Sequence, residues 1–314
     1  MRIAVFFWLC LALTARAEDA RTLAFTVPWG AGTGAVGREA ASSANAYQGP
    51  ASVRAGRDGE ILVADTVNHR ILRFTPAGQL AATAEFPAQT KGDARIEGVD
   101  VAQDRAGDLW VLELAMRALV HLGADGALKG RLPIPVAPGA TPLFTEVATE
   151  DDGFLVFDGF DNRVLKLARD GKATVVTHEL IAGLATDSGA PLAVELASPT
   201  SAAGFTLWQL NAGQKTLRAA LTLERPANEL RLLGVDREHR AYVEVAYGGE
   251  LTRADRQVLV VSADGKVTDR MQVPVPPTEF RMHVSRCVIP AGGLLTASVT
   301  PAGLEIRTHR LSSR

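Results

Sequence analysis

The sequence predicts an all-β fold in which six small four-stranded antiparallel sheets close into a ring, as a six-bladed β-propeller. Three observations lead to this prediction. A unit of short alternating strands and turn residues recurs, and its strand-ending acids Asp65, Glu113 and Asp158 are 48 and 45 residues apart. No amphipathic helix of useful length separates the units, as an α/β fold requires. A strand-only unit this small cannot bury both faces unless it stacks radially on its neighbours.

The N-terminus reads as a secretory signal that precedes the fold. Arg2 supplies the positive charge, IAVFFWLCLAL at 3–13 is the apolar segment, and ARA at 15–17 is a small-x-small cleavage site. The apolar segment is too short to span a bilayer. We therefore expect a signal peptide over 1–17 and a single mature domain over 18–314. The mature protein is expected to be secreted, in the periplasm, as a monomer.

Composition excludes two classes of partner. After cleavage the chain has 31 Lys and Arg against 35 Asp and Glu, a formal net charge of −4 without a basic cluster. This balance argues against a nucleic-acid partner. No later stretch approaches eighteen uninterrupted apolar residues, so no membrane span is expected. Cys287 is then the only cysteine, and we expect it to be a small buried residue without a disulfide.

The strand-like segment TLAFTVPW at 22–29 lies outside the repeated units. We expect residues 22–28 to close the ring by completing the last blade, which is short. The glycines that follow, Gly32, Gly34 and Gly37, fit the pattern G-x-G-x-x-G. No helix with an apolar stripe and no second parallel strand with an acid follow them, so a dinucleotide site is not predicted. The glycines are interpreted as a flexible crossing into the first blade.

Six units follow this crossing. The first three share the same order of strands, turns and acids, whereas the last three diverge, with Val245 at the acid's place in the fifth. The predicted units span about 49–95, 96–141, 142–186, 187–230, 231–280 and 281–314.

The first unit, GPASVRAGRDGEILVADTVNHRILRFTPAGQL at 49–80, resembles an NHL repeat. It fills that family's pattern at Gly49, Pro50, Asp58, Gly59, Ala64, Asp65, Asn68, Arg70 and Gly78. The third unit matches at Gly153, Asp158, Asn162 and Arg163, and WGAGTGAVG resembles the leader that often precedes a first NHL unit. The resemblance implies a secreted, bacterial type of six-bladed propeller and implies no particular activity.

The repeated motif residues are interpreted as structural, because a catalytic group is usually needed only once. The aspartates end strands and can accept backbone N–H groups in the following turn. The arginines can reach those aspartates or neighbouring carbonyls, and the asparagines tolerate left-handed turn geometry. In the second unit Ala118 stands where the arginine belongs. The structural motif residues are Asp65, Asn68, Arg70, Asp158, Asn162 and Arg163.

Tryptophan and histidine residues within the strands are interpreted as packing groups. Trp110 and Trp208 lie inside strands and are expected to pack between blades. His121 lies at an alternating strand position and is expected to be a hydrogen-bonded structural residue. The six histidines include no pair at the spacing of a metal motif.

A ligand site requires residues that depart from the repeat and converge on one face. In a propeller, the loops that lead into the innermost strands share a face with the loops between second and third strands. No catalytic motif occurs, so catalytic residues remain unassigned. The candidate ligand-binding residues on this face are His69, Glu97, Arg117, Glu146, Phe160, Asp161, Glu250 and His283.

These observations favour a scaffold that binds a protein, peptide or saccharide, with no cofactor. The alternative is a metal-dependent propeller hydrolase or lyase of lactonase type. In that case the same acids hold Ca²⁺, or histidine and carboxylates hold Zn²⁺. A quinone-dependent sugar dehydrogenase is a third reading that has only the shared architecture in its favour. Stoichiometric bound metal separates the enzyme from the scaffold.

Overall fold

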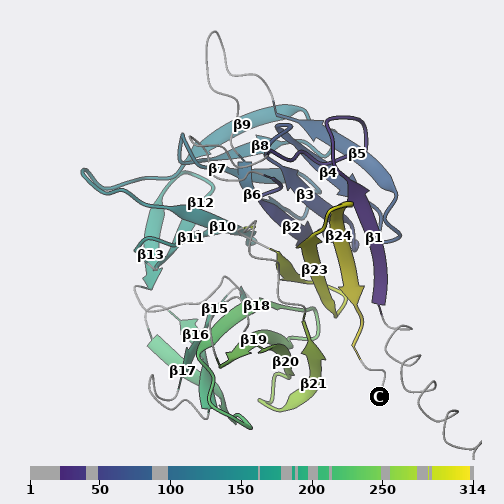
Figure 1. Ribbon diagram of the computed structural model, residues 1–314. Helices are drawn as coiled ribbons and strands as arrows, with labels where there is room; N and C mark the ends of the chain where they lie inside the picture. Colours follow the sequence, from purple (N-terminus) through teal and green to yellow (C-terminus); the bar gives the residue numbers. More distant parts are fainter. Residues whose placement is uncertain are drawn as a thin grey trace, which may run out of the picture.

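The computed structural model describes residues 22–39, 49–86, 98–161, 163–177, 186–187, 190–196, 204–211, 214–248, 255–273, 282 and 285–311. These residues form six four-stranded antiparallel sheets that stand as blades around a centre (Figure 1). The described segments contain strands and turns without a helix, and thus without a helix able to cross a membrane. The predicted all-β, six-bladed propeller is confirmed.

The first three blades follow one another along the chain. Blade 1 contains β2 (Ser52–Ala55), β3 (Ile61–Asp65), β4 (Arg70–Phe74) and β5 (Leu80–Glu85). Blade 2 contains β6 (Gly98–Gln103), β7 (Leu109–Glu113), β8 (Ala118–Leu122) and β9 (Leu128–Pro133). Blade 3 contains β10 (Phe144–Thr149), β11 (Gly153–Asp158), β12 (Arg163–Ala168) and β13 (Ala173–Thr177).

The last three blades complete the ring. Blade 4 contains β14 (Thr186–Asp187), β15 (Ala190–Leu196), β16 (Gly204–Asn211) and β17 (Gln214–Thr222). Blade 5 contains β18 (Glu229–Val235), β19 (Ala241–Tyr247), β20 (Asp255–Val261) and β21 (Val267–Gln272). Blade 6 contains β22 (Arg286–Val288), β23 (Leu294–Val299), β24 (Gly303–His309) and β1 (Thr22–Pro28). Blade 5 thus begins at Glu229, two residues before the unit predicted from 231.

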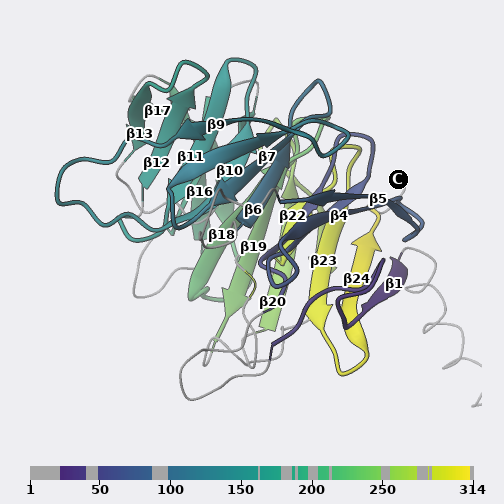
Figure 2. The same ribbon diagram turned by 90° about the horizontal axis from the view of Figure 1, so that it is seen from above.

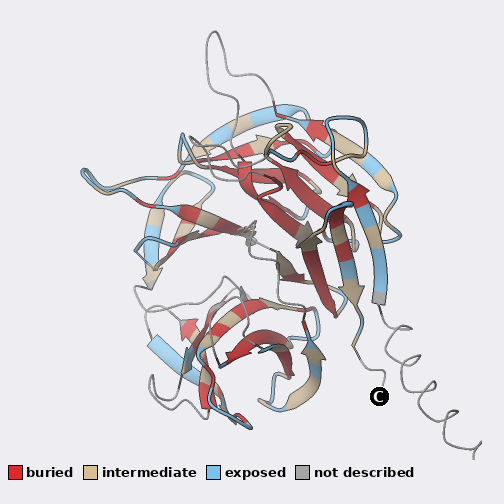
Figure 3. Ribbon diagram, in the orientation of Figure 1, coloured by how far each residue is buried: buried red, intermediate tan, exposed pale blue. Residues whose placement is uncertain are grey.

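Burial explains why some strands alternate and others do not. The second strands β3 and β7 are buried along their whole length, because both of their faces pack on neighbouring blades. The outer strand β9 is exposed at four of its six positions. Figure 3 shows the same gradient, with red strands inside the ring and pale strands at its rim. Continuous apolar runs therefore mark the middle of a blade, as they do in strands buried on both faces.

The N-terminal strand closes the ring, as predicted. Strand β1 pairs antiparallel with β24 from Thr22 opposite His309 to Pro28 opposite Gly303. It is therefore the outer strand of a blade whose other three strands come from the C-terminus (Figure 2). Val27 of this strand is buried in a cluster that also holds Leu72 of blade 1 and Leu304 of blade 6. The closing strand thus joins the core of the first blade to that of the last.

The glycine-rich crossing after β1 is anchored, whereas the sequence predicted a flexible link. Its backbone folds back on itself, with the Val36 N–H donating to Pro28 O at 2.9 Å. The Arg70 guanidinium donates to the carbonyls of Gly32 and Ala35 at 3.0 and 2.8 Å. At Gly37 a Cβ atom would lie 2.5 Å from the Val67 Cβ, so only glycine fits this close approach. At Gly37, therefore, the glycine serves close packing against blade 1.

Deleting residues 22–29 is expected to abolish cooperative folding. The deletion removes the whole ladder with β24 and exposes a strand edge together with the cluster around Leu304. Thermal unfolding followed by circular dichroism measures the effect. A sharp, native-like transition in the shortened chain contradicts this account of closure.

Candidate functional site

Strand register defines two different faces of the propeller. Gly98 at the start of β6 lies opposite Glu113 at the end of β7, and Phe144 at the start of β10 lies opposite Asp158 at the end of β11. The starts of the inner strands and the turns after the second strands therefore share one face. We call this the turn face, and it carries the turns 66–69, 114–117 and 159–161. The opposite face, with the turns 56–60, 104–108 and 236–240, is the hairpin face.

The turns on the two faces use different residues in the left-handed conformation. On the hairpin face this place is filled by Gly59, Gly78, Gly107, Gly126, Gly171, Gly265 and Gly292, with His239 as an exception. On the turn face it is filled by His69, with φ 54°, by Arg117, with φ 53°, and in blade 5 by Gly248, with φ 64°. Large side chains in this conformation are uncommon, and such outliers gather at functional sites.

The left-handed residue of the first turn is His69 and not Asn68, which the sequence analysis interpreted as able to tolerate this conformation. The Asn68 amide donates instead to Asp65 Oδ2 at 2.8 Å and to Gly30 O at 2.9 Å. Asparagine thus acts here through its side chain rather than through its tolerance of positive φ. The corresponding prediction for Asn162 lies outside the described residues.

The motif acids are buried and bound by arginine. Asp65 accepts from Arg70 Nε at 2.9 Å and from the Gly37 N–H at 2.8 Å. Asp158 accepts from Arg163 Nε at 3.1 Å and from the Leu143 N–H at 2.9 Å. Each acid therefore ties the turn of its own blade to the segment that leads into the inner strand. These contacts are structural in kind.

Blade 2 keeps the buried acid but lacks the arginine. Glu113 is fully buried, lies opposite Ala118, and accepts a hydrogen bond from the Met116 N–H. Its Oε1 atom is buried and has no hydrogen-bond partner among the residues that the structure describes. A buried carboxylate with an unsatisfied oxygen costs free energy that Asp65 and Asp158 avoid. The buried acid without an arginine partner is the point at which blade 2 departs from blades 1 and 3.

The central channel holds a network of ion pairs that joins four blades. Arg54 of β2 donates to both oxygens of Asp100 on β6, at 2.8 and 2.5 Å. It also lies 3.4 Å from Glu146 of β10, whose other oxygen accepts from Arg231 of β18 at 2.7 Å. The Val147 N–H donates to Asp100 Oδ2 at 2.8 Å. The inner strands of these blades are thus joined by ion pairs across the channel.

A second group of ion pairs extends this network into blades 5 and 6. Glu244 accepts from Arg256 at 3.2 Å and from Arg286 at 3.0 Å, and Arg256 also contacts Glu229 at 3.1 Å. At Arg54, burial alone lowers the pKa, but the charges of Asp100 and Glu146 outweigh it and hold the pKa above its usual value. The channel carboxylates named here therefore already have cationic partners, which leaves them poorly placed to hold a metal ion.

The predicted ligand residues fall into three groups. His69, Arg117, Phe160 and Asp161 lie on the turn face, in blades 1, 2 and 3. Glu146 lies in the channel network instead. The remaining three, Glu97, Glu250 and His283, lie outside the described residues.

The sequence analysis did not identify three members of the channel network. Arg54, Asp100 and Arg231 occupy the same inner strands that the analysis had already found by their alternation. A charged residue within the inner strand of several blades is the signal that could have revealed them. It was hidden because an alternating strand on a solvated face also carries charges.

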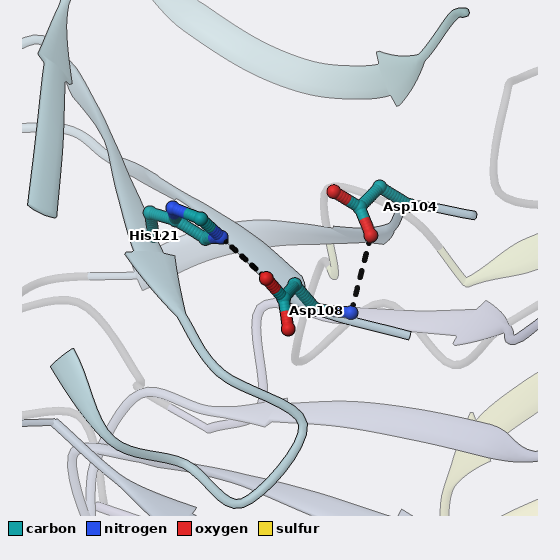
Figure 4. Close-up of side chains that lie close together, drawn as sticks. All are labelled: Asp104, Asp108 and His121. Atoms are coloured by element: carbon teal, nitrogen blue, oxygen red, sulfur yellow. Dashed lines mark hydrogen bonds and ion pairs between the residues drawn. The ribbon is translucent and has the colours of Figure 1, made fainter. Parts of the chain in front are cut away.

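One group of side chains has the residue types of a metal site, but its side chains already have hydrogen-bond partners. Carboxylate oxygens of Asp104 and Asp108 and a ring nitrogen of His121 lie within 4.8 Å of one another (Figure 4). Asp108 accepts from His121 Nε2 at 2.8 Å and from Lys129 Nζ at 2.7 and 2.9 Å. The hydrogen bond from Lys129 lowers the pKa of Asp108. Because the Lys129 ammonium group already pairs with Asp108 where a metal ion would bind, this group is a structural ion-pair cluster.

The neighbouring aromatic contacts support that reading. Trp110 donates to Asp104 Oδ2 at 3.0 Å, stacks on His121 with ring centres 4.0 Å apart, and contacts Phe154 of blade 3 at 4.4 Å. The arrangement recurs in blade 5, where Tyr242 donates to Asp236 at 2.9 Å from the same turn position. The packing roles predicted for Trp110 and His121 are confirmed.

Comparisons with known proteins agree with this geometry. The NHL repeat family model matches residues 47–74, so the chain is a six-bladed β-propeller that carries an NHL repeat. This is the repeat that the sequence resembled. No curated protein shows significant similarity to the sequence.

Several solved structures share the fold at low identity. A member of the DUF4221 family from Bacteroides vulgatus is 10% identical over 92% of this chain and 95% of that chain, with a TM-score of 0.60. A candidate gluconolactonase is 18% identical over 84% and 90%, with a TM-score of 0.52. Virginiamycin B lyase from Staphylococcus aureus is 14% identical over 84% and 85%, with a TM-score of 0.50. These similarities show a common architecture and no common chemistry.

Neutralising the acids of blades 1 and 2 is expected to have opposite effects. Asp65→Asn leaves the buried Arg70 unpaired and should lower the free energy of unfolding by about 3 kcal/mol. Glu113→Gln removes a charge that lacks a full set of donors and should raise the free energy of unfolding by about 1 kcal/mol. Urea titrations of both variants and the parent chain provide the measurement. Equal destabilisation by the two substitutions contradicts the assignment of Glu113 as unsatisfied.

Proposed function

We propose that this propeller binds a partner protein or peptide through the turn face of blades 2 and 3. The observation that carries the proposal is the exposure of Phe160, which is 69% accessible at the tip of the third-blade turn. Leu143 and Met116 on the same face are 42% and 39% exposed. Apolar side chains at the tips of solvent-facing turns are typical of interaction surfaces.

The turn that carries Phe160 is held firmly. The Phe160 N–H donates to Asp158 Oδ1 at 3.2 Å, and the Gly159 N–H donates to Leu143 O at 2.8 Å. The aromatic ring is therefore presented from a fixed backbone, which reduces the entropy lost on binding. Covering one such side chain contributes about 1.5–3 kcal/mol.

The surrounding charges add specificity to this apolar surface. Arg117 and His69 lie on the adjoining turns of blades 2 and 1, and both project from left-handed backbone positions. Asp161 lies beside Phe160 and pairs with Arg163 at 3.2 Å. Phenylalanine, methionine and arginine are enriched at the cores of protein interfaces. A protein or peptide suits this surface better than a saccharide, because its exposed anchors are aromatic and aliphatic.

Binding is proposed to need no metal. The described channel carboxylates are paired with arginine, and Lys129 occupies the cation position beside Asp108. The alternative of a lactonase-like hydrolase or lyase on Ca²⁺ has no specific contact in its favour among the described residues. Stoichiometric calcium in the purified protein would distinguish this enzyme from a scaffold that binds without metal.

Photo-crosslinking from the turn tip tests the proposal. A photoreactive phenylalanine analogue at position 160 should give a discrete adduct in the native host. The same group at position 170 should give none, because Asp170 is an exposed residue on the opposite end of the same blade. Replacing His69 and Arg117 with alanine should weaken the adduct at 160. Identical adducts from both positions, or none from position 160, would contradict the proposal.

We also propose that the protein acts outside the cytoplasm, as a periplasmic monomer after cleavage near Ala17. The charged start, apolar segment and small-x-small site of residues 1–17 support this. Intact-mass analysis of protein from the periplasmic fraction should give a chain that begins at Glu18. A chain that retains Met1 and stays in the cytoplasmic fraction contradicts it.

A further inference from the structure

A cavity of about 290 Å³ lies where the central channel opens on the hairpin face. The inner strands of blades 1, 2, 3, 5 and 6 contribute to its wall. We call it the channel-mouth cavity. Its apolar lining includes Val101, Val147, Leu233, Val235, Val288 and Pro290. It is on the opposite side of the molecule from Phe160, so it is independent of the proposed partner surface.

The charged groups that line this cavity are all cationic. Arg54 and Arg57 line it, and no aspartate or glutamate is among the described residues of its wall. Arg54 uses Nε and Nη2 for its ion pairs, which leaves Nη1 without a hydrogen bond to the described residues. Arg57 donates through Nη1 to Arg105 O, and no ion pair holds its guanidinium among the described residues. Two guanidinium groups thus present unused donors to an apolar space.

Nearby ionisable groups do not cancel this positive charge. Cys287 lines the same cavity, and burial raises the pKa of its thiol to about 11, so the thiol is neutral at physiological pH. Asp100 is engaged by Arg54 through both oxygens. Two acids line an adjoining cavity that Arg57 also lines, and both have other partners: Asp151 pairs with Arg105 at 2.7 Å and Glu150 with Lys166 at 3.4 Å. Arg57 therefore carries the uncompensated charge at the mouth.

We propose that the channel-mouth cavity binds a small organic carboxylate with an apolar body. The carboxylate would accept hydrogen bonds from Arg57 and from Nη1 of Arg54, and the body would pack against Val147, Val235 and Val288. Guanidinium groups bind carboxylates through short, charge-assisted hydrogen bonds. A concave apolar wall with a few convergent polar groups is the usual form of a small-molecule site.

Three small molecules test the proposal on the full mature chain. Benzoate combines the anion with an apolar ring, benzamide keeps the ring without the charge, and acetate keeps the charge without the ring. Titration calorimetry should show saturable binding of benzoate and affinities at least about tenfold lower for the other two, as expected for the loss of a charged hydrogen bond or of apolar burial. Benzoate should also shift the methyl NMR signals of Val147, Val235 and Val288.

Variants at exposed arginines separate the site from general charge attraction. Arg57→Ala should reduce benzoate affinity about tenfold, to the level of benzamide. Arg310→Ala, an exposed arginine outside the cavity wall, should leave it unchanged. Both substitutions are at the surface, and equal melting temperatures will confirm that both variants fold. Equal affinity for benzoate and benzamide, an unaltered Arg57→Ala variant, or methyl shifts away from the cavity would overturn the proposal.

Discussion

Closure of the ring is the constraint on which the rest of the structure depends. Each blade buries its middle strands only because a neighbouring blade covers each of its two faces. The last blade lacks an outer strand until β1 pairs with β24. The same strand leads directly into the glycine crossing, which Arg70 and Asp65 hold against blade 1. One segment therefore fixes both sides of the seam. The positions of the turns on either face follow from that fixed ring.

The two faces of the ring carry different chemical groups, and the channel network lies between them. Arg54, Asp100, Glu146 and Arg231 join four inner strands across the centre of the ring. On the turn face, the turns carry exposed apolar and cationic side chains. On the other side lies an apolar cavity with Arg54 and Arg57 in its wall. A protein partner and a small anion can thus be considered for the same molecule without competing for one surface.

The sequence pattern predicted the fold well because the signals of strands, turns and repeats lie within single units. Alternation, turn glycines and the repeated Asp65 and Asp158 lie within single units, and the closing strand stood out as a segment without a unit. The site was harder to predict because its contacts join blades. Arg54 finds Asp100 46 residues away and Glu146 92 residues away, and no spacing rule links them. The sequence also did not show that His69 rather than Asn68 takes the left-handed position, because either residue can occupy it and the Asn68 amide bonds Asp65 instead.

The seam between β1 and β24 also shapes how the chain reaches its native state. Among the described strands, β1 is the first along the chain and β24 the last, so the ring stays open until β24 is available. Meanwhile the unpaired edge of β24 is a template for the equivalent β1 of another copy. Exchange of that strand between two copies would satisfy the same hydrogen bonds and yield an interlocked dimer. Refolding at high protein concentration therefore makes strand exchange a competitor of closure within one chain.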